Sequence, residues 1–150
     1  MLVRGEQADG SERWSSPFGQ LTVRHPAPGV VVFVEVGSLD ILFVDPIIAH
    51  SNRALEEART VEVFVDCYDL ASYDPEVRNA ATRWLRRNAS RVTAQHMLVR
   101  SRFTTIGLAV VSLAFGGLIH GHHDRASFEA ALAQAVRRPR SRLTPVELHG

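Results

Sequence analysis

The chain contains no lysine, because all 17 of its Lys and Arg residues are arginines. This absence excludes Schiff-base chemistry, a lysine general base and the lysine of a phosphate-binding loop. Cysteine is almost absent too, and the lone Cys67 has no partner for an internal disulfide. No charged segment followed by an apolar one opens the chain. These features are typical of a reducing compartment, so we expect a cytoplasmic protein.

Long hydrophobic runs are also missing. The longest one, residues 103–119, is interrupted by glycine, serine and threonine, whereas a membrane-spanning helix needs about 20 strongly apolar residues. We therefore expect no membrane span. The chain has 150 residues, 45% of them hydrophobic, which is enough for one domain with a core.

Charge is distributed unevenly along the chain. Residues 1–74 carry a formal charge of −7 and residues 75–150 carry +8. The two halves pack against each other, or they simply face water, or the second half presents a basic face to an acidic partner or to phosphate groups. That basic face would consist of Arg83, Arg86, Arg87, Arg91, Arg100 and Arg102. Aromatic residues are not interleaved with these arginines in the way that a binder of single-stranded nucleic acid requires, so we do not expect a nucleic-acid partner.

The spacing of apolar residues predicts an α/β domain. Residues 1–17 lack periodicity and are predicted to be a flexible N-terminal arm. Residues 18–137 are predicted to form the domain, and residues 138–150 a C-terminal tail. The domain begins with a hairpin of two strands at 21–24 and 30–36. The second strand is almost continuously apolar, which indicates that both faces of the sheet are covered.

Two Asp-Pro pairs, Asp45-Pro46 and Asp74-Pro75, predict helix starts with aspartate as the N-cap and proline at the first helical position. Further elements are expected between and after these helices. They are strands at 61–65, 96–99 and 118–120 and helices at 101–115 and 125–136. The order ββαβαβαβα predicts a mixed, mainly parallel sheet of about five strands with about four helices.

Three segments that follow the strand at 61–65 form a pattern. Asp66 follows that strand, and Asp74 stands eight residues later, before a helix. The other two segments are Arg83-Trp84-Leu85-Arg86-Arg87-Asn88 and Asp124-Arg125-Ala126-Ser127-Phe128-Glu129-Ala130. In this order they resemble the STAS superfamily, specifically the SpoIIAA-like branch of small bacterial proteins related to anti-sigma factor antagonists.

The resemblance implies a STAS fold and a regulatory role. In the antagonist pattern an Asp-Ser-Ser-Gly begins the second helix, and a partner kinase phosphorylates one of its serines. Here Pro75 stands in place of the serine, and Glu76 follows it. Proline has no hydroxyl, so this phosphoswitch cannot operate at that position. Glu76 is either a fixed negative charge that mimics phosphate or an ordinary acidic residue of a first helical turn.

We expect a non-catalytic regulatory or scaffolding module that binds a protein partner, such as a kinase or a sigma-factor regulator. The contacts would come from the loop and helix that follow the strand at 61–65, through polar groups at the helix start and arginines further along. The predicted partner-binding residues are Asp66, Asp69, Ser72, Tyr73, Asp74, Glu76, Arg83, Arg86 and Arg87.

The apolar helix at 101–115 leaves four alternatives open. Its apolar side chains spread around the whole circumference, so one side packs on the sheet and the other needs a cover. The cover is a neighbouring part of the chain, a second copy in a homodimer, a partner, or a lipid-like ligand. A ligand is included because the SpoIIAA-like branch is similar in fold to Sec14 lipid-transfer domains, and the protein would then be a carrier or sensor of that ligand. The residues concerned are Phe103, Ile106, Val110 and Leu113.

An enzyme is the least supported class, and no cofactor is expected. The short polar loop that carries Asp66 and Asp69 offers no visible means of desolvating just one of them, as a catalytic carboxylate pair requires, so we expect structural or cap-forming roles for them. Cys67 lacks an identifiable catalytic partner and is expected to be a semi-buried thiol. The cluster from His120 to His123 is not expected to bind metal, because adjacent side chains on an extended segment point in opposite directions.

Overall fold

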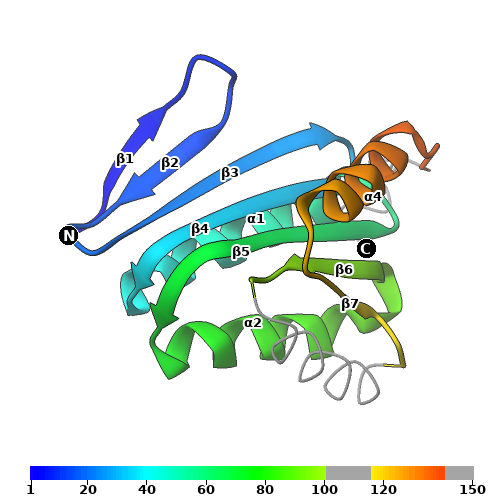
Figure 1. Ribbon diagram of the computed structural model, residues 1–150. Helices are drawn as coiled ribbons and strands as arrows, with labels where there is room; N and C mark the ends of the chain where they lie inside the picture. The colour runs from blue at the N-terminus through cyan, green and yellow to red at the C-terminus, as the bar shows by residue number, and fades with distance from the viewer. Residues whose placement is uncertain (101–115, 141–150) are drawn as a thin grey trace.

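The computed structural model describes residues 1–100 and 116–140. Its centre is a sheet of seven strands that lie side by side in chain order (Figure 1). The pairs β1–β2, β2–β3 and β3–β4 are antiparallel, whereas β5, β6 and β7 each run parallel to the strand before them. The strands are β1 (Val3–Glu6), β2 (Glu12–Ser15), β3 (Gly19–Ala27), β4 (Val30–Leu39), β5 (Val61–Tyr73), β6 (Val92–Leu98) and β7 (Ile119–His122).

Helices cover both faces of this sheet. Helices α1 and α2 pack on one face, and α4 packs on the other (Figure 1). Short 3₁₀ turns precede α1 and follow α2. The bounds are η1 (Ile41–Phe43), α1 (Val44–Glu57), α2 (Pro75–Asn88), η2 (Ala89–Arg91) and α4 (Arg125–Arg137). No helix among the described residues is both long and apolar enough to cross a membrane.

The protein has two hydrophobic cores, one on each face of the sheet, and the side chains along β5 point alternately into one and the other. Val61, Val63 and Val65 lie in the core beneath α1 and α2. Phe64 points the other way and packs edge-on against Phe128 of α4, with ring centroids 5.7 Å apart. Strand β4 alternates in the same manner. The prediction that the strand at 30–36 is covered on both faces is therefore confirmed.

Residues 1–17, predicted as a flexible arm, form the strands β1 and β2 instead. Strand β2 pairs with β3 and carries Trp14, which packs against the core beneath α1 and α2. The turn between β1 and β2 is closed by Asp9, whose carboxylate accepts hydrogen bonds from the backbone and hydroxyl of Ser11. All four residues of β1 are exposed, so the sequence there has no apolar alternation that would reveal an edge strand.

The strand predicted at 61–65 extends to Tyr73, so the expected polar loop after Asp66 is part of β5. The ten-residue β4 continues beside it and pairs with it as far as Leu39 and Tyr73. The pairing shifts register near Gly37, whose φ of +75° suits only glycine. At about 3.3 Å per residue, Asp66 and Asp74 lie up to roughly 26 Å apart. The two aspartates therefore do not meet at one corner.

The two helix starts predicted from the Asp-Pro pairs agree with the structure to different extents. Asp74 is the N-cap residue of α2 and Pro75 is its first residue, as predicted, although the Asp74 side chain makes no capping bond. Helix α1 begins at Val44 rather than after Asp45, because the chain already turns in η1. The helix predicted at 101–115 lies outside the described residues, with Phe103, Ile106, Val110 and Leu113.

Candidate functional site

The carboxyl ends of β4 and β5 meet the start of α2 at one end of the sheet. We call Ser72, Tyr73, Asp74, Pro75 and Glu76 the β5–α2 corner; all five residues are exposed. The backbone N–H of Asp74 donates to the carbonyl of Leu39 at 2.9 Å, which ties the corner to the end of β4. The corner is therefore a fixed and accessible surface.

Large apolar side chains are exposed at the same end of the sheet. The fractional exposure is 78% for Phe18, 56% for Ile41, 45% for Leu42 and 41% for Tyr73. Phe18 precedes β3, and its carbonyl accepts a hydrogen bond from the backbone N–H of Ser38 in β4. The two exposed residues of η1 follow shortly after Leu39, which pairs with Tyr73 at the end of β5. We call Phe18, Ile41, Leu42 and Tyr73 the apolar rim. Such a grouping is typical of an interaction surface.

Polar groups of the corner have defined partners. The hydroxyl oxygens of Ser38 and Ser72 lie 2.9 Å apart in a hydrogen bond between β4 and β5. Burial raises the pKa of the Tyr73 phenol, so this hydroxyl stays protonated at neutral pH. Glu76 lies in the first turn of α2, where a negative charge interacts favourably with the helix dipole.

The arginines of α2 lie on its outer side. Arg83, Arg86 and Arg87 are exposed, while Trp84 between them is buried and donates from Nε1 to the side-chain oxygen of Asn52 at 2.9 Å. At 1.5 Å per residue, these arginines lie about 10–16 Å beyond Glu76 along the helix axis. The acidic start and the basic second half of α2 are thus separate parts of one exposed surface.

Two other arginines of the predicted basic face have partners within the chain. Arg91 donates to the carbonyls of Leu55 and Ala58 at 2.6 and 2.9 Å, and so caps the end of α1. Arg100 pairs with Asp69 at 2.9 Å. Arg102 lies outside the described residues. The basic face that the structure presents is therefore the arginine side of α2.

The predicted site residue Asp66 lies elsewhere. Its side chain is buried on the α4 face of the sheet, where one oxygen accepts from Arg125 at 2.8 Å and the other from the backbone of Tyr68 at 3.1 Å. Asp69 is exposed and pairs with Arg100. Each carboxylate has its own arginine, so the two do not share a substrate position.

Cys67 lies beside Glu35, with its sulfur 3.5 Å from a carboxylate oxygen. Burial raises the pKa of Glu35 to about 7. Burial and the neighbouring Glu35 also raise the pKa of the Cys67 thiol well above its ordinary value. A thiol held in its protonated form is a poor nucleophile, which agrees with the expected structural role.

Sequence reasoning missed how the histidines are arranged. His25 and His50 are hydrogen-bonded to each other at 2.8 Å, and so are His96 and His122 at 3.0 Å. The members of each pair are far apart in the chain, so no local motif announces them. In the described part of the chain, no group of three or more potential ligands is placed to hold a metal ion.

Comparisons with known proteins bear on the fold. No family model and no curated protein matches the chain. The chain is similar to the crystal structure of an uncharacterized DUF3478-family protein with a SpoIIAA-like fold from Shewanella loihica, at 11% identity over 79% of this chain and 98% of that chain, with a TM-score of 0.63.

A second similar structure is the anti-sigma factor antagonist SpoIIAA in its unphosphorylated form. It is 14% identical, the match covers 79% of this chain and 99% of that chain, and the TM-score is 0.51. These likenesses show that the chain has a SpoIIAA-like α/β fold. They confirm the predicted fold class, although the described residues form seven strands where about five were predicted, together with three α-helices and two 3₁₀ turns.

Proposed function

We propose that this protein is a non-catalytic regulatory or scaffolding module that binds a protein partner through the β5–α2 corner and the arginine side of α2. The observation that carries the proposal is the apolar rim, which exposes four large apolar side chains at the end of the sheet where α2 begins. The structural likeness to an anti-sigma factor antagonist supports a partner of the regulatory kind, such as a kinase or a sigma-factor regulator.

The chemistry of the surface defines what the partner must present. Apolar side chains would pack against Tyr73 and its neighbours, and acidic groups would pair with Arg83, Arg86 and Arg87. Tyrosine and arginine are the residue types that most often dominate binding energy at interfaces. Pro75 makes the start of α2 independent of phosphorylation at that position. The module would then bind its partner constitutively, in the cytoplasm as the sequence predicts.

The proposal also corrects the predicted site. Asp66 is buried and bound to α4, so it supports the fold and does not face a partner. Asp69 is exposed but already paired with Arg100. The remaining predicted residues, from Ser72 onwards, form the proposed surface.

The experiment is quantitative capture of the native partner by the purified protein. The double variant Tyr73→Ala, Arg83→Ala should lose at least tenfold in affinity, because hot-spot truncations typically cost about 2 kcal/mol or more. The matched control is Gln134→Ala, Arg137→Ala, which alters two exposed residues of α4 on the other face of the sheet. Equal affinity of both double variants would refute the proposed surface.

A further inference from the structure

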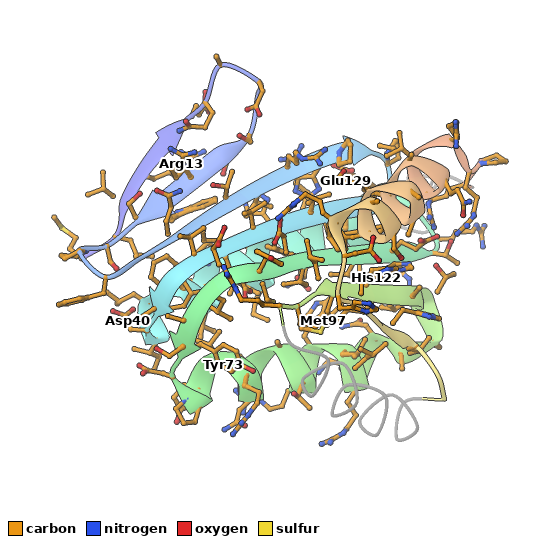
Figure 2. The ribbon with its side chains drawn as sticks, viewed as in Figure 1. Arg13, Asp40, Tyr73, Met97, His122 and Glu129 are labelled. Atoms are coloured by element: carbon orange, nitrogen blue, oxygen red, sulfur yellow. The ribbon has the colours of Figure 1, made fainter. Side chains whose placement is uncertain are left out.

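Four side chains on the α4 face of the sheet form a continuous series of polar contacts, which we call the Ser127 relay. The hydroxyl of Ser127 lies 2.7 Å from Nδ1 of His122. Nε2 of His122 lies 3.0 Å from Nδ1 of His96, and Nε2 of His96 lies 3.4 Å from a carboxylate oxygen of Glu62. The four residues come from α4, β7, β6 and β5, and Figure 2 shows His122 beneath α4.

The carboxylate of Glu62 fixes the direction of every bond in the Ser127 relay. An ionised carboxylate only accepts, so His96 carries its proton on Nε2 and has a lone pair on Nδ1. His122 must then donate from Nε2, which leaves its own Nδ1 as an acceptor. The hydroxyl of Ser127 consequently donates its proton to His122. A nucleophile, a base and a group that orients the base are thus in contact, which is the arrangement of an activated hydroxyl.

The ionised state of Glu62 is secured by its surroundings. Its side chain is only 2% exposed, and one oxygen accepts from Arg138 and from Arg140, the latter at 2.7 Å. Burial alone would raise the pKa of Glu62, but the contacts with His96, Arg140 and Arg138 outweigh it and lower the pKa. The carboxylate is therefore negative at neutral pH and remains an acceptor.

Aromatic contacts hold the two imidazole rings in place. His96 stacks on Phe64 with centroids 4.5 Å apart and an angle of 8° between the planes. His122 meets Phe128 edge-on at 5.9 Å. Because each ring is flanked by an aromatic side chain, the distances within the Ser127 relay are set by packing as well as by hydrogen bonds.

The outer end of the relay is open to solvent. Ser127 is exposed in the first turn of α4, and its backbone N–H donates to the capping carboxylate of Asp124 at 2.8 Å. The cap fixes the backbone that carries the hydroxyl. A reagent can reach Ser127 while its base stays partly buried beneath α4.

We propose that Ser127 is a nucleophilic hydroxyl that accepts an acyl group from an activated acyl donor, such as a thioester or an aryl ester. In this step Oγ attacks the carbonyl carbon and its proton passes to Nδ1 of His122. The bond from that carbon to the leaving group then breaks, and the thiolate or aryloxide departs with the electron pair. The proton that His122 received passes to the leaving group or to solvent, which returns the relay to its starting state. The product is an acyl ester on Ser127, formed once per molecule.

The remainder of the relay disperses the charge that the transfer creates. When Nδ1 of His122 gains a proton, its Nε2 proton can move to Nδ1 of His96. The positive charge then lies next to the carboxylate of Glu62, inside the protein, where electrostatic interactions are stronger than in water. His96 and Glu62 are thus positioning residues, and only Ser127 and His122 handle the reacting atoms.

The test uses p-nitrophenyl acetate as the acyl donor and the full-length protein. Release of p-nitrophenolate should accompany the gain of one acetyl group, located on Ser127 by peptide mass spectrometry. Ser127→Ala should abolish this adduct. His122→Gln should slow it by about 10²-fold or more, the usual contribution of a general base. Ser90→Ala, which alters an exposed serine of η2, is the matched control and should react like the wild type.

The pH profile separates a base from a structural histidine. Burial, His96 and His120 lower the pKa of His122, and Asp124 and His123 are the other charged or titratable groups that act on it. The acetylation rate should be constant near pH 7 and fall in acid as His122 gains a proton. In His122→Gln the rate should instead rise with hydroxide concentration. An unchanged profile, an adduct on a histidine, or equal rates for Ser127→Ala and wild type would each overturn the proposal.

Discussion

The two faces of the sheet each hold a pair of histidines anchored by a glutamate. On the α4 face the order is Glu62, His96 and His122. On the α1 face Glu12 contacts Nε2 of His50 at 3.1 Å, and Nδ1 of His50 lies 2.8 Å from Nε2 of His25. We call this second series the His25 relay. In both relays a carboxylate sets the tautomer of the first ring, and the first ring sets that of the second.

The difference lies at the outer end. In the Ser127 relay the last ring lies within hydrogen-bond distance of an exposed hydroxyl. In the His25 relay the last atom is Nδ1 of His25, which is buried and has no hydrogen-bond partner in the described part of the structure. Both relays thus consist of a glutamate and two histidines. We assign a reactive role to the one that ends at a hydroxyl and a purely structural role to the one that ends at a buried lone pair.

The anchoring glutamates differ as well. Glu62 is enclosed, and the side chain of its partner Arg140 is only 4% exposed. Glu12 is partly exposed and pairs with the more exposed Arg4. Glu12 belongs to β2, and Trp14 of the same strand meets His50 edge-on at 5.2 Å. The His25 relay thus fastens the N-terminal hairpin to α1.

The largest expected loss of stability comes from replacing Glu62, and the same replacement of Glu12 provides the comparison. Glu62→Ala leaves a buried guanidinium without its counter-charge and should lower the free energy of unfolding by about 3–5 kcal/mol. Glu12→Ala breaks a partly exposed pair and should cost about 1 kcal/mol. Urea denaturation at pH 7 measures both values. If the two variants lose equal stability, the contrast between the anchors is wrong.

The contrast also shows what the sequence was able to predict. Alternation of apolar residues in β4 and β5 reflects burial on two faces, so the α/β class and the two-sided covering followed from the pattern. Strand β1 is exposed throughout and owes its place to pairing with β2. Pairing of exposed strands leaves no periodic signal, which is why residues 1–17 looked unstructured.

The candidate sites were predictable to different extents. The β5–α2 corner followed from the Asp74-Pro75 signal, which is local and depends on backbone geometry alone. The Ser127 relay depends on parallel register, which places His96 opposite His120 and Leu98 opposite His122. Register between distant strands is decided by the whole sheet, so no local pattern indicated that His96 lies beside His122, or that Asp66 lies within a strand that continues to Tyr73.

The second prediction concerns how the His25 relay makes the stability of the protein depend on pH. Burial, together with Arg53 and His50, lowers the pKa of His25 to about 4 in the folded protein. The unfolded chain has the ordinary value of about 6.5 and takes up its proton first as pH falls. Stability should therefore be full above about pH 6.5 and decline towards pH 4, by roughly 1–2 kcal/mol after allowance for solvent screening.

Urea denaturation at several pH values tests this dependence. His25→Gln removes the titrating group, so the decline between pH 6.5 and 4 should become shallower. His123→Gln, at an exposed position immediately after β7, is the matched control and should keep the wild-type slope. A decline that is the same in both variants would assign the acid sensitivity to other groups.

The smallest expected effect is at Ser127 itself. Ser127→Ala removes a hydroxyl from an exposed position of α4, and the backbone cap from Asp124 does not depend on that side chain. The free energy of unfolding should therefore change by less than about 0.5 kcal/mol, as at most surface positions. Thermal denaturation beside the acetylation assay separates the two roles. If Ser127→Ala destabilises the protein as much as Glu12→Ala does, the hydroxyl is a structural clamp, and the two relays would not differ in the way proposed.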